Sequence, residues 1–277
     1  GIVAKHLKKS GANVELTSIV GNDDNFNFAK KNLQNNRIKF NYFVDNRPTV
    51  LKNAIISSGQ RLIKIDKLDN SPITDDLTIK ISSLIKKSKK DIYIFSDFRH
   101  GIFHKKNIID LSKSIPKNKF RVADTQVASR WGNILDFSDF DFITPNEKEV
   151  RFALADQDSS ISELTRNLQK KMKFKAMILK LGDRGIFVVD RTKKINKSFY
   201  LPSFANRVLD PVGAGDALLA YSSLSFYHSK CMITSSIIGN AAAAIECEKD
   251  GNIAVEVNDV LKKLKEIENY SKFKRKY

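Results

Sequence analysis

The spacing of apolar and polar positions predicts a chain of alternating helices and strands. Short apolar runs such as 91–96 and 176–181 are typical of strands that are buried on both faces of a parallel sheet. Asp23 and Thr74 precede helical patterns and are candidate N-caps. Helices are expected at 2–9, 23–36, 74–89, 104–114, 146–155, 160–172, 214–228, 231–247 and 257–270. Strands are expected at 13–20, 38–44, 49–56, 61–68, 91–96, 120–124, 140–144, 176–181, 185–189 and 195–200.

The order of these elements predicts an α/β sandwich of three layers. Strands and helices alternate from residue 74 onward, so we expect a mostly parallel central sheet with helices on both faces. The strands at 38–44, 49–56 and 61–68 read as a hairpin or small antiparallel sheet, with a turn at 57–60 (SSGQ). We therefore expect one domain over 1–277 with a small β lid inserted at about 38–68.

The start of the chain departs from this alternation. It opens on Gly1 rather than Met, and the helix at 2–9 comes before any strand and is ended by Gly11. This start predicts that the chain is a fragment from which the first strand is missing.

Composition narrows the class of protein. The 277 residues are 42% hydrophobic, which is enough for a sizeable core. No apolar run approaches the roughly 18 residues that a membrane span needs. Cys231 and Cys247 are too few and too far apart for a metal or disulfide pattern, which favours the reducing cytoplasm. The net charge of +17 is scattered along the chain, so attraction of phosphorylated small molecules is favoured over nucleic-acid binding.

The sequence DPVGAGDALLA at 210–220 carries the strongest chemical signal. Gly213 and Gly215 allow a ligand to approach the backbone closely, and the helix that follows has unpaired N–H groups at its start. Such a helix start binds anions. Asp216 there is either an ordinary helix cap or a base that takes a proton from a hydroxyl attacking a phosphate. Asp210 stands six residues upstream, which a simple cap does not explain.

This sequence resembles the second signature of the ribokinase-like (PfkB) sugar kinases, D-x-x-G-A-G-D. Three further segments resemble family motifs in the same order: TPNEKE at 144–149, LKLGDRGIFV at 179–188 and GNAAAAIECEKDG at 239–251. The resemblance implies a ribokinase-like fold, ATP and Mg²⁺ as cofactors, and Asp216 as the general base. Around it, the resemblance implies an anion hole formed by Gly213, Ala214 and Gly215 with the N–H of Asp216. It implies a nucleotide-binding part at about 140–277. The residues there that it implies in nucleotide binding are Asn146, Glu147, Lys148, Glu149, Lys180, Gly182, Gly185, Asp210 and Asn240, with Asn146 and Glu149 holding magnesium through water.

A narrower resemblance points to the acceptor. The segment 47–70 is similar to the lid of heptose-phosphate kinases, with Arg47, Thr49 and Lys52 in the matching R-P-T-x-x-K core. FSDFRHGIF at 95–103 resembles a loop of the same group and brings in Asp97, Arg99 and His100. The segment 123–134, which contains Trp131 beside Arg130, is a further candidate for the sugar pocket. Ala54 occupies a place where these kinases often have Arg.

The sequence therefore predicts a kinase of a sugar or sugar phosphate, with heptose phosphate as one candidate. The resemblance also implies a fused or partnered nucleotidyltransferase and a homodimer formed through the lid. Two alternatives stay open, which are a non-catalytic sugar or nucleotide sensor on the same fold and a basic module for nucleic acid or anionic lipid. Simpler interpretations also remain for single motifs. NEKE is commonly a capped helix start, and Arg47 and Lys52 are compatible with surface charges on a strand.

Overall fold

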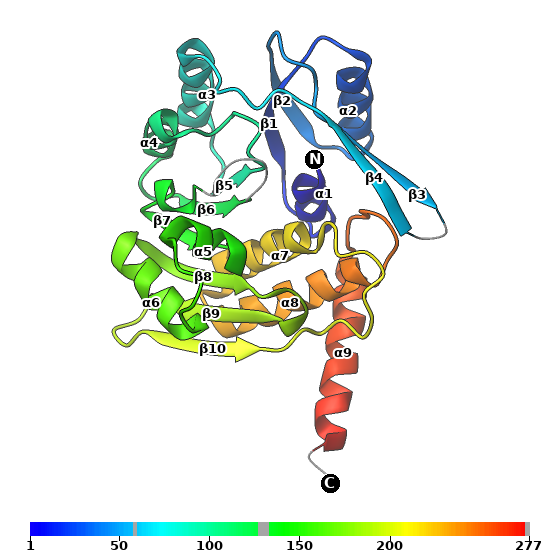
Figure 1. Cartoon of the computed structure of the whole chain (residues 1–277), viewed down its shortest axis with the longest axis vertical. Coiled ribbons are helices and arrows are strands. Elements are labelled where there is room, and N and C mark those ends of the chain that lie inside the picture. Colours follow the sequence, from blue (N-terminus) through cyan, green and yellow to red (C-terminus); the bar gives the residue numbers. More distant parts are fainter. Residues whose placement is uncertain (58–59, 127–132, 275–277) are drawn as a thin grey trace.

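A six-stranded sheet forms the centre of the computed structural model, which describes residues 1–57, 60–126 and 133–274 (Figure 1). In sequence order its strands are β5 (Ile92–Asp97), β6 (Phe120–Thr125), β7 (Phe140–Ile143), β8 (Phe174–Lys180), β9 (Ile186–Asp190) and β10 (Lys197–Leu201). The spatial order is β10-β9-β8-β7-β6-β5. Strands β5 to β8 are parallel, whereas β9 pairs antiparallel with both β8 and β10. The expected mostly parallel sheet is confirmed.

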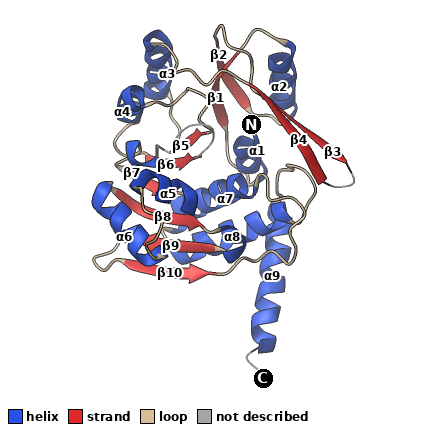
Figure 2. Cartoon of the chain, viewed as in Figure 1, coloured by secondary structure: helices blue, strands red, loops and turns tan. Residues whose placement is uncertain are grey.

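Helices cover both faces of this sheet (Figure 2). One layer contains α3 (Asp75–Lys87), α4 (Lys105–Ser114), α5 (Glu147–Leu154) and α6 (Ile161–Lys171). The other contains α1 (Ile2–Lys9), α7 (Ala214–Ser229), α8 (Met232–Cys247) and α9 (Val257–Lys274). Strand β8 shows why both layers form. Its residues Met177 and Leu179 pack into the first core and Ala176 and Ile178 into the second, as alternation along a strand requires.

Two small sheets lie outside the central one. Strands β1 (Glu15–Val20) and β2 (Lys39–Val44) are parallel and joined through α2 (Asp24–Asn35). Strands β3 (Leu51–Ser57) and β4 (Gln60–Lys67) form an antiparallel ribbon. The expected antiparallel pairing of 38–44 was therefore wrong. The antiparallel part is the β3–β4 ribbon, which is called the lid below. Alternation within a strand indicates its buried face but not its partner, and a helical crossover makes the parallel partner available here.

The other expected elements are present with ends shifted by a few residues. Both predicted N-caps are confirmed, because Asp23 accepts a hydrogen bond from Phe26 N–H and Thr74 accepts one from Leu77 N–H. Two short 3₁₀ helices, Ile134–Asp136 and Gly182–Arg184, were not expected. Residues 58–59 of the predicted turn, and Arg130 and Trp131, lie outside the described residues. No helix in the described parts of the chain is both long and apolar enough to cross a lipid bilayer.

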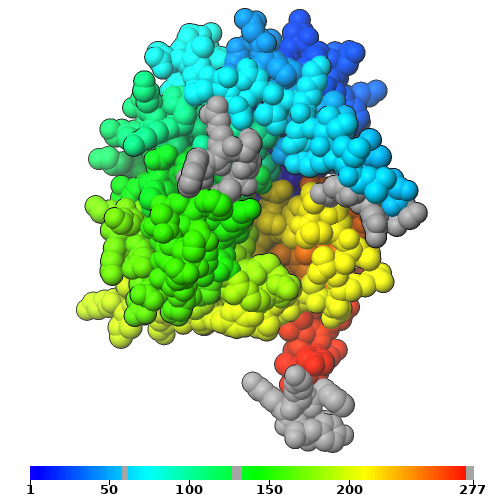
Figure 3. Space-filling view, viewed as in Figure 1, coloured from blue at the N-terminus to red at the C-terminus, as the bar shows by residue number. Residues whose placement is uncertain are grey.

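A large groove of about 1310 Å³ opens between the small sheets and the body. Strands β1 and β5 line its length, and they are not paired with each other. At the lid end it is lined by Thr49 and Lys52 from one side and by Asp97, Phe98 and His100 from the other. Figure 3 shows a further recess, between the cyan lid and the yellow segment that precedes α7; residues 202–213 of that segment do not line the groove. The lid therefore lies across the groove from the carboxyl end of β5, and open α/β sheets bind ligands at this edge.

Candidate active site

The amino-terminal end of α7 is shaped by glycine. Gly213 has φ of 95°, and a Cβ there would lie 2.5 Å from Asn252 Oδ1 and 2.7 Å from Glu246 Oε1. Only glycine fits this position without displacing those side chains. Ala214 N–H points to Pro211 O at 3.4 Å, a long contact. Within the described part of the chain, the N–H groups of Gly215 and Asp216 have no hydrogen-bond acceptor. The first turn therefore offers two open donors and the positive end of the helix dipole to an anion.

Asp216 is a buried carboxylate beside these donors. Burial raises the pKa of Asp216 to about 6, with a further increase from the charge of Asp124 and an opposing decrease from Lys180. The group is therefore ionised at neutral pH and is more basic than an ordinary aspartate, which suits a proton acceptor.

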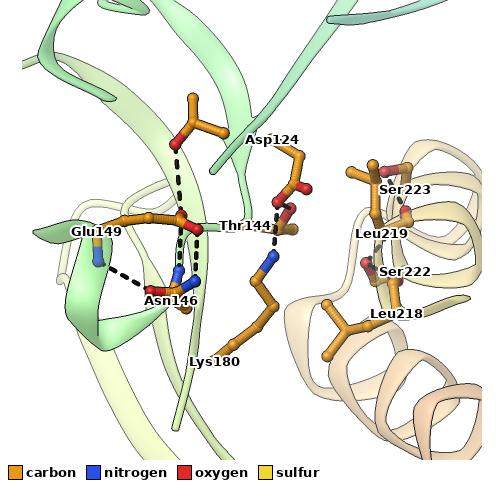
Figure 4. Close-up of polar contacts among 10 residues, drawn as sticks. Asp124, Thr144, Asn146, Glu149, Lys180, Leu218, Leu219, Ser222 and Ser223 are labelled. Carbon is orange, nitrogen blue, oxygen red and sulfur yellow. Dashed lines mark hydrogen bonds and ion pairs between the residues drawn. The ribbon is translucent and has the colours of Figure 1, made fainter. Parts of the chain in front are cut away.

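The carboxyl ends of β6 and β8 bring an ion pair next to α7. Lys180 Nζ lies 2.7 Å from Asp124 Oδ1, and Thr144 Oγ1 donates to the same oxygen at 2.7 Å. Figure 4 shows the Lys180 side chain extending toward Asp124 and Thr144. It lies between Asn146 and Glu149 on one side and the helix that carries Leu218 on the other. Asp124 and Thr144 were not singled out from the sequence, although they lie in the candidate segments 123–134 and 144–149 and the buried strand FRVAD ends on Asp124. A polar residue at the carboxyl end of a buried parallel strand was the available signal.

Asn146 and Glu149 form a capping box at the start of α5. Asn146 Oδ1 accepts from Glu149 N–H at 2.8 Å, and Glu149 Oε2 accepts from Asn146 N–H at 2.9 Å. Glu149 Oε1 accepts from the Asn146 side chain as well. The simpler interpretation of NEKE as a capped helix start therefore holds for the geometry. Glu149 is nonetheless fully buried, and burial raises its pKa to about 7. Ionising the carboxylate at this position therefore costs folding stability, which an ordinary exposed cap would not.

The neighbouring residues of this motif lie around a smaller pocket of about 370 Å³. Glu147 is engaged by two arginines, with Arg151 Nε at 2.8 Å and Arg184 as a second partner. Lys148 lies over the ring of Phe152, at 5.8 Å. Of the residues that line this pocket, those suited to contact an anion are Asn146, Lys148, Lys180 and Gly182.

The remaining predicted nucleotide residues surround the strand–turn–strand of β8 and β9. Gly182 has φ of 67° and open space where a Cβ would lie, whereas a Cβ on Gly185 would lie 2.3 Å from Leu201 O. Asn240 is buried and donates to Pro202 O at 2.7 Å. Asp210 Oδ1 accepts from Val212 N–H at 3.0 Å. Asn240 and Asp210 thus shape the segment 202–213 that leads into α7.

Arg47 and Thr49 fasten the base of the lid. Arg47 Nε lies 2.7 Å from Asp45 Oδ2, and its guanidinium also donates to Ser71 O at 3.0 Å. Thr49 Oγ1 accepts from Gly21 N–H at 2.9 Å. The Thr49 backbone N–H donates to Asp23 Oδ2 at 2.8 Å, so the cap of α2 also holds the lid.

Lys52 is the charged member of the R-P-T-x-x-K core that lines the groove. Its ammonium lies over the ring of Phe98, 5.6 Å from the centroid. Burial, and next the charge of Lys64, lower the pKa of Lys52, while Asp216 raises it. Burial, and next Lys52, lower the pKa of His100 to about 4, so His100 is neutral at physiological pH. Lys52 therefore lines the groove from the lid, within electrostatic range of Asp216.

Asp97 is occupied within its own loop. It accepts from Arg99 N–H at 2.7 Å, from the Arg99 guanidinium at 3.3 Å and from Asn133 Nδ2 at 2.8 Å. These bonds hold Arg99 at φ of 60°, in the left-handed region. Asp97 and Arg99 thus shape the loop that carries Phe98 and His100.

Comparison with known proteins gives one matching family and several relatives. The model of the pfkB family carbohydrate kinases matches residues 3–258. The chain is 25% identical over 268 residues to the bifunctional protein HldE of Sulfurimonas denitrificans, covering 94% of the chain and 54% of that protein. It is 27% identical over 263 residues to HldE of Campylobacter jejuni subsp. doylei, covering 93% and 54%. The chain therefore spans a little over half the length of these relatives.

Solved structures confirm the fold. Phosphofructokinase-2 of Escherichia coli in complex with potassium superposes with a TM-score of 0.78 at 15% identity, over 94% of this chain and 84% of that one. Ribokinase of Thermotoga maritima superposes with a TM-score of 0.74 at 22% identity, over 95% and 86%. The ribokinase-like fold expected from the sequence is thus present.

The role of Thr49 in the lid base gives a testable prediction. Thr49→Val keeps the shape of the side chain but leaves Gly21 N–H without its acceptor. Because an unsatisfied buried donor costs about 1–3 kcal/mol, we expect the free energy of unfolding to fall by that amount. Urea unfolding measures it, with Thr49→Ser as the control that retains the hydroxyl. Unchanged stability of Thr49→Val would show that the bond to Gly21 does not hold the lid base.

Proposed function

The chain belongs to the pfkB family of carbohydrate kinases, and we propose that it transfers the γ-phosphoryl group of ATP to a hydroxyl of a sugar that already carries a phosphate. A heptose phosphate is the first candidate acceptor. The observation that carries the proposal is the position of Asp216. This carboxylate of raised pKa stands beside two open N–H groups, and the charge of Lys52, on the lid, acts on it.

The reaction follows from this geometry. The acceptor hydroxyl oxygen bonds to the γ-phosphorus of ATP, while the bond from that phosphorus to the β–γ bridging oxygen breaks and its electron pair leaves with ADP. The hydroxyl proton passes to the carboxylate of Asp216. The N–H groups of Gly215 and Asp216 donate to the phosphoryl oxygens, where negative charge must be stabilised. Ala214 contributes less, because its N–H is directed toward Pro211 O. Phosphoryl transfer needs little beyond such positioning and charge stabilisation.

The phosphates of ATP fit the pocket between α5 and the end of β8. Lys148 and Lys180 supply positive charge there, and Gly182 leaves open space where any other residue would place a Cβ. Gly185, Asp210 and Asn240 support this site by shaping the adjoining backbone. We assign the nucleotide to this side of α7 and the acceptor to the lid side.

Mg²⁺ fits this site only through water. Both carboxylate oxygens of Glu149 already accept hydrogen bonds from Asn146. The described residues hold no group of three or more His, Cys, Asp or Glu side chains arranged for a metal ion. Mg²⁺ commonly keeps several waters and is shared with substrate phosphates, which agrees with such a site. Asn146 and Glu149 would hold these waters, and the ion would neutralise phosphate charge.

The lid supports a phosphorylated acceptor. Lys64 pairs with Asp66 at 3.0 Å, whereas Lys52 is stacked on Phe98 and faces the groove. A partly buried ammonium of this kind gains most by pairing with an anion. We assign Lys52 to the acceptor phosphate, and Arg47, Thr49, Asp97 and Arg99 to holding the lid and loop in position for it.

We also propose that the kinase works with a nucleotidyltransferase, on the same polypeptide or as a partner. The relatives reported above are named bifunctional, and this chain matches a little over half of their length. A kinase that adds a second phosphate to a sugar phosphate would supply a substrate for nucleotide transfer.

The role of Asp216 predicts both a rate and a pH profile. Asp216→Asn removes the proton acceptor, and we expect kcat to fall by about 10²–10⁴ while ATP binding is retained. In the native chain the base acts when ionised. With the Asp216 pKa at about 6, kcat/KM should therefore be constant above about pH 7 and fall about tenfold per pH unit below 6. Coupled ADP release measures both, with the exposed Asp158→Asn as control. Full turnover by Asp216→Asn would refute the assignment.

The acceptor class is tested with a panel of hexoses, heptoses and their phosphates. We expect ATP turnover with a phosphorylated sugar, and we expect Lys52→Gln to raise its KM at least tenfold with kcat little changed. The same variant should leave the KM of an unphosphorylated sugar unaltered. Turnover of unphosphorylated sugars only would contradict the proposed acceptor. ATP binding with no turnover of any sugar would favour the non-catalytic sensor.

The outer face of the lid supports a homodimer. Ile55 and Ile63 are a cross-strand pair, and with Ile65 they are 49%, 53% and 53% exposed. An isolated two-stranded ribbon is marginally stable in water, so covering this face would stabilise the lid. We propose that the same face of a second copy covers it.

A single charged residue placed on this face of the lid should prevent the dimer from forming. We expect the native chain to elute as a dimer with light-scattering detection, and Ile63→Lys to elute as a monomer. Ile79→Lys is the matched control, because Ile79 is equally apolar and exposed but lies on α3. A native monomer at tens of micromolar would contradict the dimer.

A further inference from the structure

Lys180 is the ammonium on which the charges of the site converge. It comes from the end of β8 and pairs with Asp124 at the end of β6. The negative charges of Glu149 and Asp216 also act on it. In the described part of the chain, however, Asp124 is its one carboxylate partner within ion-pair distance.

The ammonium lies against the first turn of α7. A Cβ on Gly215 would lie 3.4 Å from Lys180 Nζ and 3.7 Å from its Cδ. The open N–H groups of Gly215 and Asp216 belong to the same turn. Lys180 therefore stands beside the place where an anion would sit on this helix. The Lys180 ammonium and the two open N–H groups would then contact the same anion.

Lys180 is also accessible from the nucleotide pocket. It lines the pocket together with Asn146, Lys148 and Gly182, and its side chain is 17% exposed. A lysine presents a compact charge on a flexible stem, so a shift of its last carbons changes its partner. The ammonium can thus exchange part of its contact with Asp124 for a phosphate oxygen.

We propose that Lys180 is a catalytic residue that contacts the phosphoryl group in transit, and that Asp124 and Thr144 position it. This inference rests on the proposed function. The helix donors and the lysine then hold the phosphoryl oxygens from two sides, which matches the charge spread over these oxygens during transfer. Asp124 also keeps the ammonium from pairing with Asp216, so the Asp216 carboxylate stays available for the hydroxyl proton.

The contact is tested by comparing ATP with ADP, because only ATP carries the phosphoryl group to be transferred. In calorimetric titrations with Mg²⁺, we expect Lys180→Gln to weaken ATP binding at least tenfold and ADP binding less than twofold. We expect kcat to fall about 10²–10³-fold. Lys180→Arg, which keeps the charge, should retain the preference for ATP. Lys175→Gln is the matched control, since Lys175 lies on the same strand with 70% of its side chain exposed.

The positioning role of Asp124 has a separate signature. Asp124→Asn keeps a group that accepts from Thr144 but removes the charge that holds the ammonium. We expect kcat to fall about tenfold or more with the KM for ATP nearly unchanged. If Lys180→Gln fails to fold because it leaves Asp124 unpaired, the double variant Lys180→Gln/Asp124→Asn removes both charges and should show the same loss of preference for ATP.

The outcomes separate this inference from the proposed function. The inference is overturned if Lys180→Gln weakens the binding of ATP and of ADP equally, or if it leaves kcat unchanged. If Asp216→Asn is inactive at the same time, the kinase assignment stands without it. A native chain that binds ATP without turnover still tests the lysine through the ATP and ADP affinities. A native chain that binds neither nucleotide overturns both.

Discussion

The site depends on burying acidic groups around one ammonium. Asp124, Glu149 and Asp216 all act electrostatically on Lys180, and burial raises the pKa of Glu149 and of Asp216. Like charges in a dry environment repel, so these carboxylates could not remain ionised together without a nearby cation. A buried ion pair rarely stabilises a fold as well as apolar packing does. The arrangement is therefore a cost in stability, which the two hydrophobic cores on either side of the sheet must offset.

The sheet explains how these groups meet. Parallel strands end at a common edge, so the ends of β6 and β8 place Asp124 and Lys180 within 2.7 Å although they lie far apart in sequence. Helix α7 then directs its first turn at the same edge, because Gly213 lets the chain turn sharply into the helix. The lid reaches this edge from the opposite side of the groove. Positioning by rigid elements leaves only the lid and the connecting loops to adapt to a ligand.

Local signals made most of the fold predictable. Asp23 and Thr74 mark real helix starts, and the buried runs of β5 and β8 are strands of a parallel sheet. The partner of 38–44 was not predictable, because strand pairing is non-local and the pattern inside a strand does not encode it. Asp124 was not singled out for a similar reason. A single acidic residue at the end of a strand is common, and its role becomes visible only when the fold brings it next to Lys180. The structural bonds of Arg47 and Thr49 join them to Ser71 and Gly21, which no spacing rule connects.

The fastened base of the lid determines where the lid can move. Arg47 and Thr49 tie its root to Asp45, Ser71 and the connection between β1 and α2 through several hydrogen bonds, so the ribbon does not pivot freely at its base. The pairing register of the ribbon shifts between Ile55 and Ile56, an irregularity of the kind that bends a strand. Little conformational entropy is then left to lose when a ligand closes the lid, so more of the contact energy is available for affinity. The anchoring bonds thus reduce the freedom of the lid before any ligand arrives.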